Sequence, residues 1–374
     1  MEQILGIVLL SLGGLSSASF YVPSHLVKKW SWETYWITLG FVAWIIMPSV
    51  GGMLTTPDLW GILRSSSAAS LLGAYLFGAL WGFGGLMCGL ALRFLGLSLG
   101  QSISLGVCAI VGTLVPAMLD GKLGLLVSTQ AGLVVLAGFL VCLGGIALCG
   151  YAGMLKEQRL TDEQKKESIK DFALVKGVTV AIFGGIMSAS MALAFTAGKP
   201  IAAAAVAAHT QQVFMNMPIL VLALAGGFTT NFISTMIITA RNKRFGDYVM
   251  QPAGTLSLNY FLALISGLMW YAQYFGYGTG ATKMGQYSFA SWSIFMAAII
   301  IFSNIWGLLL KEWKLVDGRT RACLWLGIVT LVISVVMIGV GDGLARRLAA
   351  ANSKFSESVQ WRTCHEIRSH RLVR

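Results

Sequence analysis

Long apolar runs alternate with short polar segments along the whole of this 374-residue chain. About 20 apolar residues are enough for a helix to cross the ~30 Å hydrocarbon core of a bilayer. Ten runs meet this requirement with few or no charges, near 3–23, 35–55, 68–90, 96–118, 128–150, 174–196, 209–238, 258–278, 289–310 and 322–342. The pattern predicts an all-α integral membrane protein with ten transmembrane helices.

Composition supports this prediction, since 56% of the residues are hydrophobic and only 11% are charged. A soluble domain carries about 25% charged residues. The net charge of +12 comes from the loops and the C-terminal segment rather than from one basic face. We therefore expect the lipid bilayer, and not a nucleic acid, as the partner of this charge distribution.

The basic residues also predict an orientation, because Lys and Arg mark the cytoplasmic side of membrane proteins. Most of them lie in the loops that follow the odd-numbered spans, including the charged segment 156–171. The even-numbered loops carry only Arg64, Lys122, Lys199 and Lys283. Both termini are therefore predicted to be periplasmic. The basic segment 343–374 argues for the opposite orientation, but most of its charges lie far from a span.

The ten spans fall into two halves of five around the charged centre. An odd number of spans per half makes the halves enter the membrane in opposite senses, as in carriers built from inverted repeats. Residues 77–98 and 266–287 align at a constant offset of 189, which matches Trp81 with Trp270. We predict an N-terminal five-helix repeat (1–151), a charged central loop (152–173), a C-terminal five-helix repeat (174–342) and a basic, disordered tail (343–374).

Two glycine-rich stretches, GALWGFGG (78–85) and AGGFTTN (225–231), lie inside predicted spans. Small residues let helix backbones approach closely in a bilayer, where no hydrophobic drive brings helices together. We expect these stretches to be helix contact faces. Because glycine is common in membrane helices anyway, any single glycine could also be there without such a role.

The sequence argues against an enzyme. Its four histidines form no pair with helical metal-binding spacing, and no glycine-rich phosphate loop is followed by Lys-Ser or Lys-Thr. Five of the six cysteines lie in or at the ends of spans, so neither structural disulfides nor a metal site is expected. We predict no metal and no cofactor, and the oligomeric state is left open.

Two ionisable residues lie at the mouths of predicted spans, where such groups are costly and tend to be functional. Glu33 precedes span 2 and His209 begins span 7, and both are candidates for proton coupling. Each has a structural alternative. Glu33 would fit the first turn of a helix capped by Ser31, within an interfacial belt of tryptophans, and His209 could be a neutral packing residue.

Polar amides and aromatic residues cluster on spans 8 and 9, in WYAQYFGY (270–277) and GQYSFASW (285–292). Aromatic faces pack on the apolar face of a sugar ring, while amides bind its hydroxyls, so this set favours a small neutral polyol over an ion. The candidate substrate-binding residues are Trp81, Gln101, Trp270, Tyr271, Gln273, Gln286, Tyr287 and Trp292.

Four stretches resemble the bacterial L-rhamnose–proton symporter family of the drug/metabolite transporter superfamily. They are FYVPSHLVKKWSWETYW (20–36), LFGALWGFGGLMCGLALRFLGLSLG (76–100), GLMWYAQYFGYGTGATKMGQYSFASW (267–292) and LKEW (310–313). The resemblance covers about residues 1–342. It implies an inner-membrane carrier that takes up a deoxy-sugar, L-rhamnose or a similar sugar such as L-lyxose, by proton symport.

The chain also departs from the pattern that this resemblance implies. No acidic residue follows Lys199-Pro200, Ser288 rather than an Asp follows Gln286-Tyr287, and the stretch GTGATKMG (278–285) lacks a histidine. These absent titratable groups favour an alternative, an uncoupled facilitator or an exporter of a related sugar or metabolite. A membrane sensor is a further alternative, which the lack of any soluble signalling domain disfavours.

Overall fold

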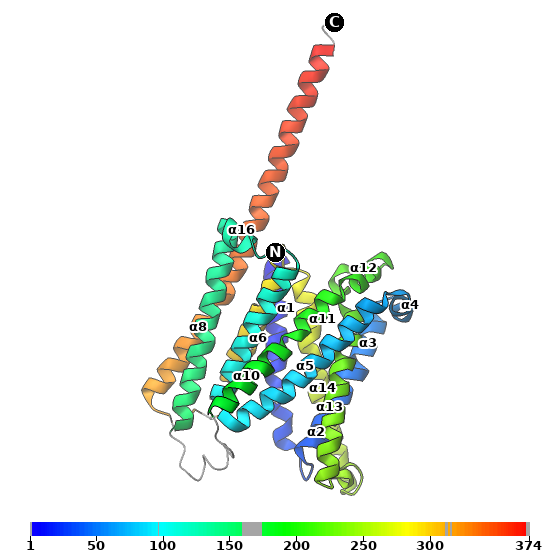
Figure 1. Ribbon diagram of the computed structural model, residues 1–374, viewed down its shortest axis with the longest axis vertical. Coiled ribbons are helices and arrows are strands. Elements are labelled where there is room, and N and C mark those ends of the chain that lie inside the picture. Colours follow the sequence, from blue (N-terminus) through cyan, green and yellow to red (C-terminus); the bar gives the residue numbers. More distant parts are fainter. Residues whose placement is uncertain (1, 96, 159–173, 311–312, 315, 372–374) are drawn as a thin grey trace.

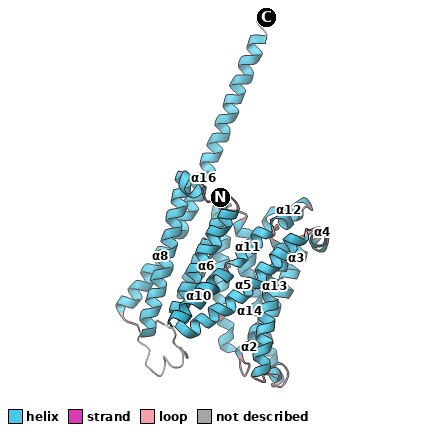
Figure 2. Ribbon diagram, viewed as in Figure 1, coloured by secondary structure: helices cyan, strands magenta, loops and turns pink. Residues whose placement is uncertain are grey.

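The computed structural model describes residues 2–95, 97–158, 174–310, 313–314 and 316–371. The described part of the chain consists of helices joined by short loops and contains no strand, as Figure 2 shows. Most of the charged central loop predicted at 152–173 lies outside the described residues. Ten helical segments among the described residues are long and apolar enough to cross a membrane, which confirms the predicted all-α membrane fold with ten spans.

The first half is built from α1 to α8, and some spans contain more than one helix. The first span joins α1 to the short 3-10 turn η1, and the second joins α2 to α3 through the π-helical turn η2. The bounds are α1 (Glu2–Ser19), η1 (Val22–Leu26), α2 (Trp32–Phe41), η2 (Val42–Ile46), α3 (Met47–Thr55), α4 (Leu59–Ser65), α5 (Ala68–Leu95), α6 (Leu97–Leu119), α7 (Leu125–Ser128) and α8 (Gln130–Gln158).

The second half runs from α10 to α16, and its first span is divided among three helices. The bounds are α10 (Leu174–Ser188), α11 (Ser190–Ala197), α12 (Lys199–Ala207), η3 (Gln212–Phe214), α13 (Met217–Arg241), η4 (Phe245–Tyr248), α14 (Ala253–Ala281), η5 (Ser288–Ala290), α15 (Ser291–Leu309) and α16 (Gly318–Arg371). Gly198 ends α11 and Pro200 lies in the first turn of α12, where a proline replaces a backbone N–H that would have no helical partner.

The described part of the predicted tail, 343–371, continues the last helix. α16 continues without a break from the tenth span to Arg371 and extends beyond the bundle, in red at the top of Figure 1. The physical reason lies in the composition of 343–371, which has no proline and contains four Ala and five Arg. Ala, Leu, Arg and Glu have high helix propensity, so the helix is not interrupted at residue 342.

Helices of one half pack mainly on helices of the other. α1 packs on α14 and α15, and α10 packs on α5 and α6. In addition, α5 contacts α13, and α14 contacts α2 and η2. α8 and α16 lie side by side at one edge of the molecule (Figure 1). The core therefore forms where the two halves meet, and its largest fully buried side chains include Trp44, Trp292, Tyr287 and Phe295.

Glycines set the distance between these helices. A Cβ added to Gly78 would lie 2.0 Å from the backbone oxygen of Ala223, and one added to Gly226 would lie 2.0 Å from that of Tyr75. The predicted contact faces are confirmed at these positions. Gly85, at the end of the first stretch, has no such neighbour within 4 Å, so there the prediction was wrong.

Candidate functional site

An aromatic cluster fills the centre of the molecule, where α2, η2, α5, α14 and α15 meet. The indole of Trp44 makes T-shaped contacts with Trp81 and Trp270, with ring centroids 6.1 and 5.3 Å apart. Trp81 and Trp270 are 5.6 Å apart, so the two tryptophans matched by the sequence offset touch each other. Tyr274 packs on both of them, at 5.9 and 5.3 Å.

The helical period of α14 explains how this cluster extends toward one end of the bundle. Trp270, Tyr274 and Tyr277 are spaced by four and three residues, so they share one face of the helix. Tyr277 makes an edge contact with Trp292 at 5.2 Å and lies 5.3 Å from Phe295. The aromatic surface therefore continues from α14 onto α15.

A cavity of about 390 Å³ opens above Tyr277, between α6, α11, α12, α13 and α14. We call it the outer cavity, and the end of the bundle that holds Asp120 and Lys199 the outer end; these names follow the orientation predicted from the basic loops. Phe195 and Tyr277 form its aromatic floor, with ring centroids 5.3 Å apart. Its polar groups include Thr196, Asn216, Thr282 and Ser288.

Two charged residues also line the outer cavity. Asp120, at the end of α6, and Lys199, at the start of α12, form an ion pair there. The lysine side chain is about half exposed, so the pair contributes little to stability. Because the two charges offset each other, the outer cavity presents mainly neutral polar and aromatic groups to a ligand.

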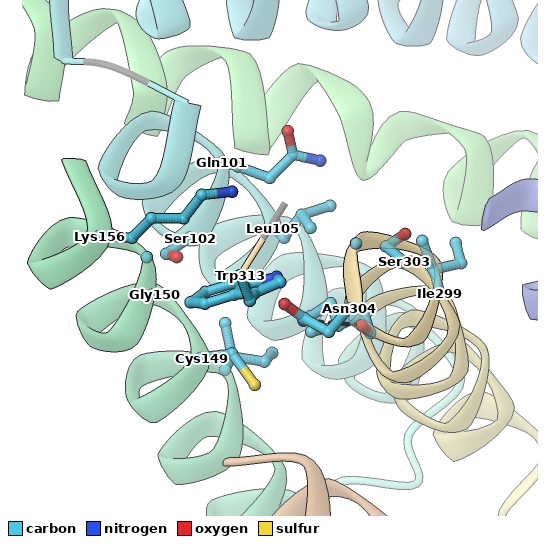
Figure 3. Close-up of a pocket in the computed structure, with 14 residues that line it drawn as sticks. Gln101, Ser102, Leu105, Cys149, Gly150, Lys156, Ile299, Ser303, Asn304 and Trp313 are labelled. Carbon is cyan, nitrogen blue, oxygen red and sulfur yellow. Dashed lines mark hydrogen bonds between the residues drawn. The ribbon is translucent and has the colours of Figure 1, made fainter. Parts of the chain in front are cut away.

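A packed layer closes the outer cavity on its inner side. The indole nitrogen of Trp292 donates a hydrogen bond to the Cys108 carbonyl at 3.2 Å, and the hydroxyls of Thr113 and Ser293 are 2.7 Å apart. These contacts hold α6 against α15. Further along the same two helices lies a second cavity, the inner pocket, of about 220 Å³ (Figure 3). The layer therefore separates two cavities at opposite ends of one helix pair.

The predicted substrate-binding residues are distributed over several places. Trp81, Trp270 and Trp292 lie in the aromatic cluster, as described above. Gln101 instead lines the inner pocket, and Gln286 is exposed in the turn after α14. The structure therefore brings together the tryptophans of the predicted set but not these two amides.

The remaining members of the predicted set are buried outside the outer cavity. The hydroxyl of Tyr287 bonds to that of Thr129 at 2.8 Å, and Tyr271 donates to the Met217 sulfur at 3.8 Å. The side-chain nitrogen of Gln273 is buried without a hydrogen-bond partner among the described residues. An unpaired buried amide is costly, which marks this position in the core as unusual.

Glu33 is buried at the opposite end of the bundle, the inner end. Ser31 caps α2 and accepts a bond from the Thr34 backbone N–H, as the structural alternative predicted. The Glu33 carboxylate accepts a hydrogen bond of 2.8 Å from the Asn242 amide, which ties α2 to the end of α13. Glu33 does not line the outer cavity.

His209 is exposed rather than buried. It follows α12 with a backbone φ of 64°, in the left-handed region, and its N–H bonds to the Val206 carbonyl at 3.0 Å. The residue therefore ends a helix at the outer end. His209 is therefore not the packing residue of the structural alternative, and its role in proton coupling stays a prediction.

Sequence reasoning missed the residues that line the outer cavity. Tyr277 belongs to the stretch WYAQYFGY, and Asn216 is a polar amide within a predicted span. Both residues could be recognised as polar or aromatic span residues in the sequence, but their proximity could not. In the fold, Asn216 donates a hydrogen bond to the Gly278 carbonyl at 3.0 Å and so lies next to Tyr277. Phe195 gave no signal, because nothing in the sequence distinguishes it from other apolar span residues.

Asp342 is a second residue whose position the sequence did not reveal. Its carboxylate is fully buried, and Oδ2 accepts hydrogen bonds from Gln3, the Gly285 N–H and Arg346 at 3.2 to 3.3 Å. Oδ1 has no partner among the described residues. The network joins α1, the α14–α15 connection and α16 at the outer end.

Ten helical segments of membrane-crossing length among the described residues, a central aromatic cluster and a neutral cavity open at one end are the features of a polytopic α-helical membrane carrier. The model of one family, the L-rhamnose-proton symport protein (RhaT), matches residues 2–345. The chain belongs to this family, whose members are transporters rather than enzymes, and it is a multi-pass protein of the bacterial inner membrane.

Named relatives cover nearly the same length. The L-rhamnose-proton symporter of Cronobacter sakazakii is 38% identical over 341 residues, which is 90% of this chain and 97% of that protein. The L-rhamnose-proton symporters of Yersinia pestis and Yersinia pseudotuberculosis are 38% identical over 343 residues, 90% of this chain and 98% of theirs. The earlier resemblance to this family is confirmed.

Proposed function

We propose that this protein imports L-rhamnose, or a similar sugar such as L-lyxose, together with a proton. Membership of the symport family and the names of the relatives support the substrate class and the coupling. The structural observation that supports the proposal is the size and lining of the outer cavity.

The outer cavity suits a small neutral sugar in size and in chemistry. Its volume of about 390 Å³ lies in the range typical of small-molecule sites, about 300–1,000 Å³. Tyr277 and Phe195 offer ring faces to the apolar side of a deoxy-sugar, while Asn216 and Thr196 offer partners for its hydroxyls. A charged ligand would instead leave one member of the Asp120–Lys199 pair without its partner.

Passage through the bundle requires the layer between the two cavities to open. Carriers of this kind work by alternating access around a central site. In our proposal the sugar enters the outer cavity and reaches the face of Trp292, and separation of α6 from α15 then exposes it to the inner end. The indole bond to Cys108 and the Thr113–Ser293 contact would break in that step.

We assign proton coupling to Glu33, with His209 as the second candidate. Glu33 is buried, and its carboxylate bond to Asn242 joins α2 to α13. A hydrogen bond to an ionised acceptor is roughly twice as strong as a neutral one. Protonation would therefore weaken this connection and favour movement of α2. His209 is exposed at the outer end, where protons can reach it directly.

An uncoupled facilitator or exporter remains the alternative, and one observation favours it. The central aromatic cluster contains tryptophan, tyrosine and phenylalanine but no titratable acid or base at neutral pH. The carboxylate that does line the outer cavity, Asp120, is already paired with Lys199.

Uptake of labelled L-rhamnose by a Tyr277→Ala variant tests the proposed site. We expect the half-saturating concentration to rise about thirtyfold, since losing a central aromatic contact costs about 2 kcal/mol. Phe261→Ala is the matched control, because Phe261 lies on the same helix and is exposed; it should leave uptake unchanged. Wild-type affinity in Tyr277→Ala would show that the sugar binds elsewhere.

A further inference from the structure

Asp342 is an ionisable residue that the transport steps described above do not use. Its side chain is fully buried at the outer end of α16, inside a segment of membrane-crossing length. A carboxylate in such a segment is costly, and residues of this kind often belong to an ion or proton pathway. Its position therefore calls for a functional explanation.

The two oxygens of the Asp342 carboxylate have unequal surroundings. Oδ2 accepts three hydrogen bonds of 3.2 to 3.3 Å, from the Gln3 amide, the Gly285 N–H and the Arg346 guanidinium. A charge-assisted N–H bond to a carboxylate is typically about 2.7–2.9 Å long, so these contacts are weak for an ionised group. Oδ1 is buried and has no partner among the described residues. A proton can therefore add to Oδ1 without displacing any of the three bonds.

The carboxylate lies directly against the connection between α14 and α15, residues 282–287. A Cβ added to Gly285 would lie 3.1 Å from the Asp342 Oδ1 and 2.9 Å from the Arg346 Nε, so glycine allows the backbone to come this close. The Arg346 guanidinium also donates to the Lys283 carbonyl. α16 therefore holds the connection at two neighbouring backbone groups, one through the carboxylate and one through the guanidinium.

Four charged groups at this end balance one another while Asp342 is ionised. The Lys283 ammonium pairs with the Glu2 carboxylate at 3.2 Å. The Arg346 guanidinium lies 3.7 Å from Glu2 and 3.3 Å from Asp342. Two carboxylates thus face two cations, and protonation of Asp342 would leave one positive charge in excess.

Among the described residues, the other elements packed here bring no further charge to Asp342. The hydroxyl of Tyr287, in the same connection, bonds to another neutral hydroxyl. α8 meets α16 at this level through Ala131 and Val135, and α15 contains no ionisable residue. Arg347, the next basic residue on α16, is exposed. The balance therefore depends on the four groups named above.

The same connection also forms a wall of the outer cavity. Thr282 lines the outer cavity and also a polar cavity of about 380 Å³, whose wall includes Lys283 and Arg346. Ser288, directly after the connection, lines the outer cavity as well. A change in how the connection is held at Asp342 therefore alters the wall of the cavity in which the sugar is proposed to bind.

We propose that Asp342 is a proton-binding residue that controls closure of the outer cavity, a role that rests on the proposed symport of sugar and proton. While ionised, Asp342 and Arg346 hold the connection 282–287 to α16, and the cavity stays open. A proton on Oδ1 removes the charge and weakens the bonds from Arg346 and the Gly285 N–H. The connection can then move over a bound sugar, so closure requires both the sugar and the proton.

Equilibrium binding of labelled L-rhamnose to the purified protein, measured at a series of pH values, tests this proposal. Because protonation favours the closed, loaded state, the wild type should bind the sugar more tightly at acidic pH. We expect the dissociation constant to rise about tenfold as the pH is raised, within the range typical of coupling between two sites. Asn cannot ionise, so Asp342→Asn should keep the acid-side affinity at every pH.

Three further variants separate this role from a structural one. Glu2→Gln removes the exposed carboxylate of the same network but leaves Asp342 able to ionise, so the rise with pH should persist. Glu33→Gln should also keep it, because Glu33 lies at the inner end and does not line the outer cavity. Gly285→Ala places a Cβ between the connection and the carboxylate, so it should reduce the rise although Asp342 is present.

A dissociation constant that rises with pH in Asp342→Asn as it does in the wild type would overturn the proposal. If that variant does not fold, an unchanged rise in Gly285→Ala would overturn it. Loss of the rise in Glu33→Gln would move the proton site to the inner end and also contradict it. Sugar-driven proton entry into cells is measured separately. If it occurs while Asp342→Asn binds like the wild type, symport stands and only the role of Asp342 fails.

Discussion

The stretch WSWET shows how single residues serve the packing of the inner end. Ser31 caps α2, and its N–H and the Thr34 hydroxyl both donate to the buried Asp247 carboxylate, at 2.8 and 3.2 Å. Trp30 packs edge-on against Tyr260 at 4.9 Å. This stretch therefore anchors the start of α2 to the α13–α14 connection, and Glu33 lies within that anchor.

Glu33→Gln tests whether the buried carboxylate also carries the proton. The amide is nearly isosteric and can still bond to Asn242, but it cannot be protonated. We expect accumulation of L-rhamnose above the external concentration to be lost while exchange of labelled for unlabelled sugar continues. Uphill accumulation by this variant would show that another residue couples the proton.

The helical period explains the position of the two matched tryptophans, while their predicted role in sugar binding stays a prediction. Trp81 and Trp270 meet at the centre because they occupy the core faces of α5 and α14, and a period of 3.6 residues indicates such faces. Gln286 was misplaced because it lies in a turn, where no period applies. The position of Phe195 in the outer cavity could not be predicted, because it depends on the breaks that divide its span into three helices. Those breaks depend on packing between the halves.

At the scale of helices, the ten spans could be predicted because the bilayer fixes their length. The internal breaks could not. The π-helical turn Val42–Ile46 lies in an unbroken apolar run, and an added Cβ on Gly267 would lie 2.7 Å from the Val42 Cβ. This turn therefore lies at a close helix crossing, which the sequence of one helix does not encode.

Substitution of Gly78 tests the close contact between α5 and α13. In Gly78→Val the new Cβ would overlap the backbone of Ala223, which cannot move as a side chain could. We expect a loss of about 1–3 kcal/mol, typical of overpacking, seen as a lower unfolding temperature in detergent. Gly85→Val is the control on the same helix and should cost less than about 1 kcal/mol. Equal unfolding temperatures in the two variants would contradict the packing.

At the scale of the whole molecule, the packing supports the predicted repeat. A five-span offset converts the α1–α14 contact into α10–α5, the α1–α15 contact into α10–α6, and the α2–α14 contact into α13–α5. These pairs are all in contact, and the matched Trp81 and Trp270 touch. The opposite orientation of the two halves stays a prediction, as does the periplasmic position of the termini.

Truncation tests whether the extension of α16 belongs to the carrier. The family match ends at residue 345, and the buried network at this end uses Asp342 and Arg346. We expect removal of 351–374 to leave L-rhamnose uptake per membrane-inserted protein unchanged. Removal of 342–374 should lower the unfolding temperature, because Gln3 and the Gly285 N–H lose their acceptor. Strong loss of uptake in the shorter truncation would give the extension a role in transport.

In the proposed function, this chain couples L-rhamnose entry to proton entry. The most direct test adds L-rhamnose to a lightly buffered, de-energised suspension of cells that overproduce the protein, while the external pH is recorded. We expect the external medium to become more alkaline when the sugar is added, and a protonophore to abolish this change. Entry of labelled L-rhamnose without any change in external pH would contradict symport and establish the facilitator instead.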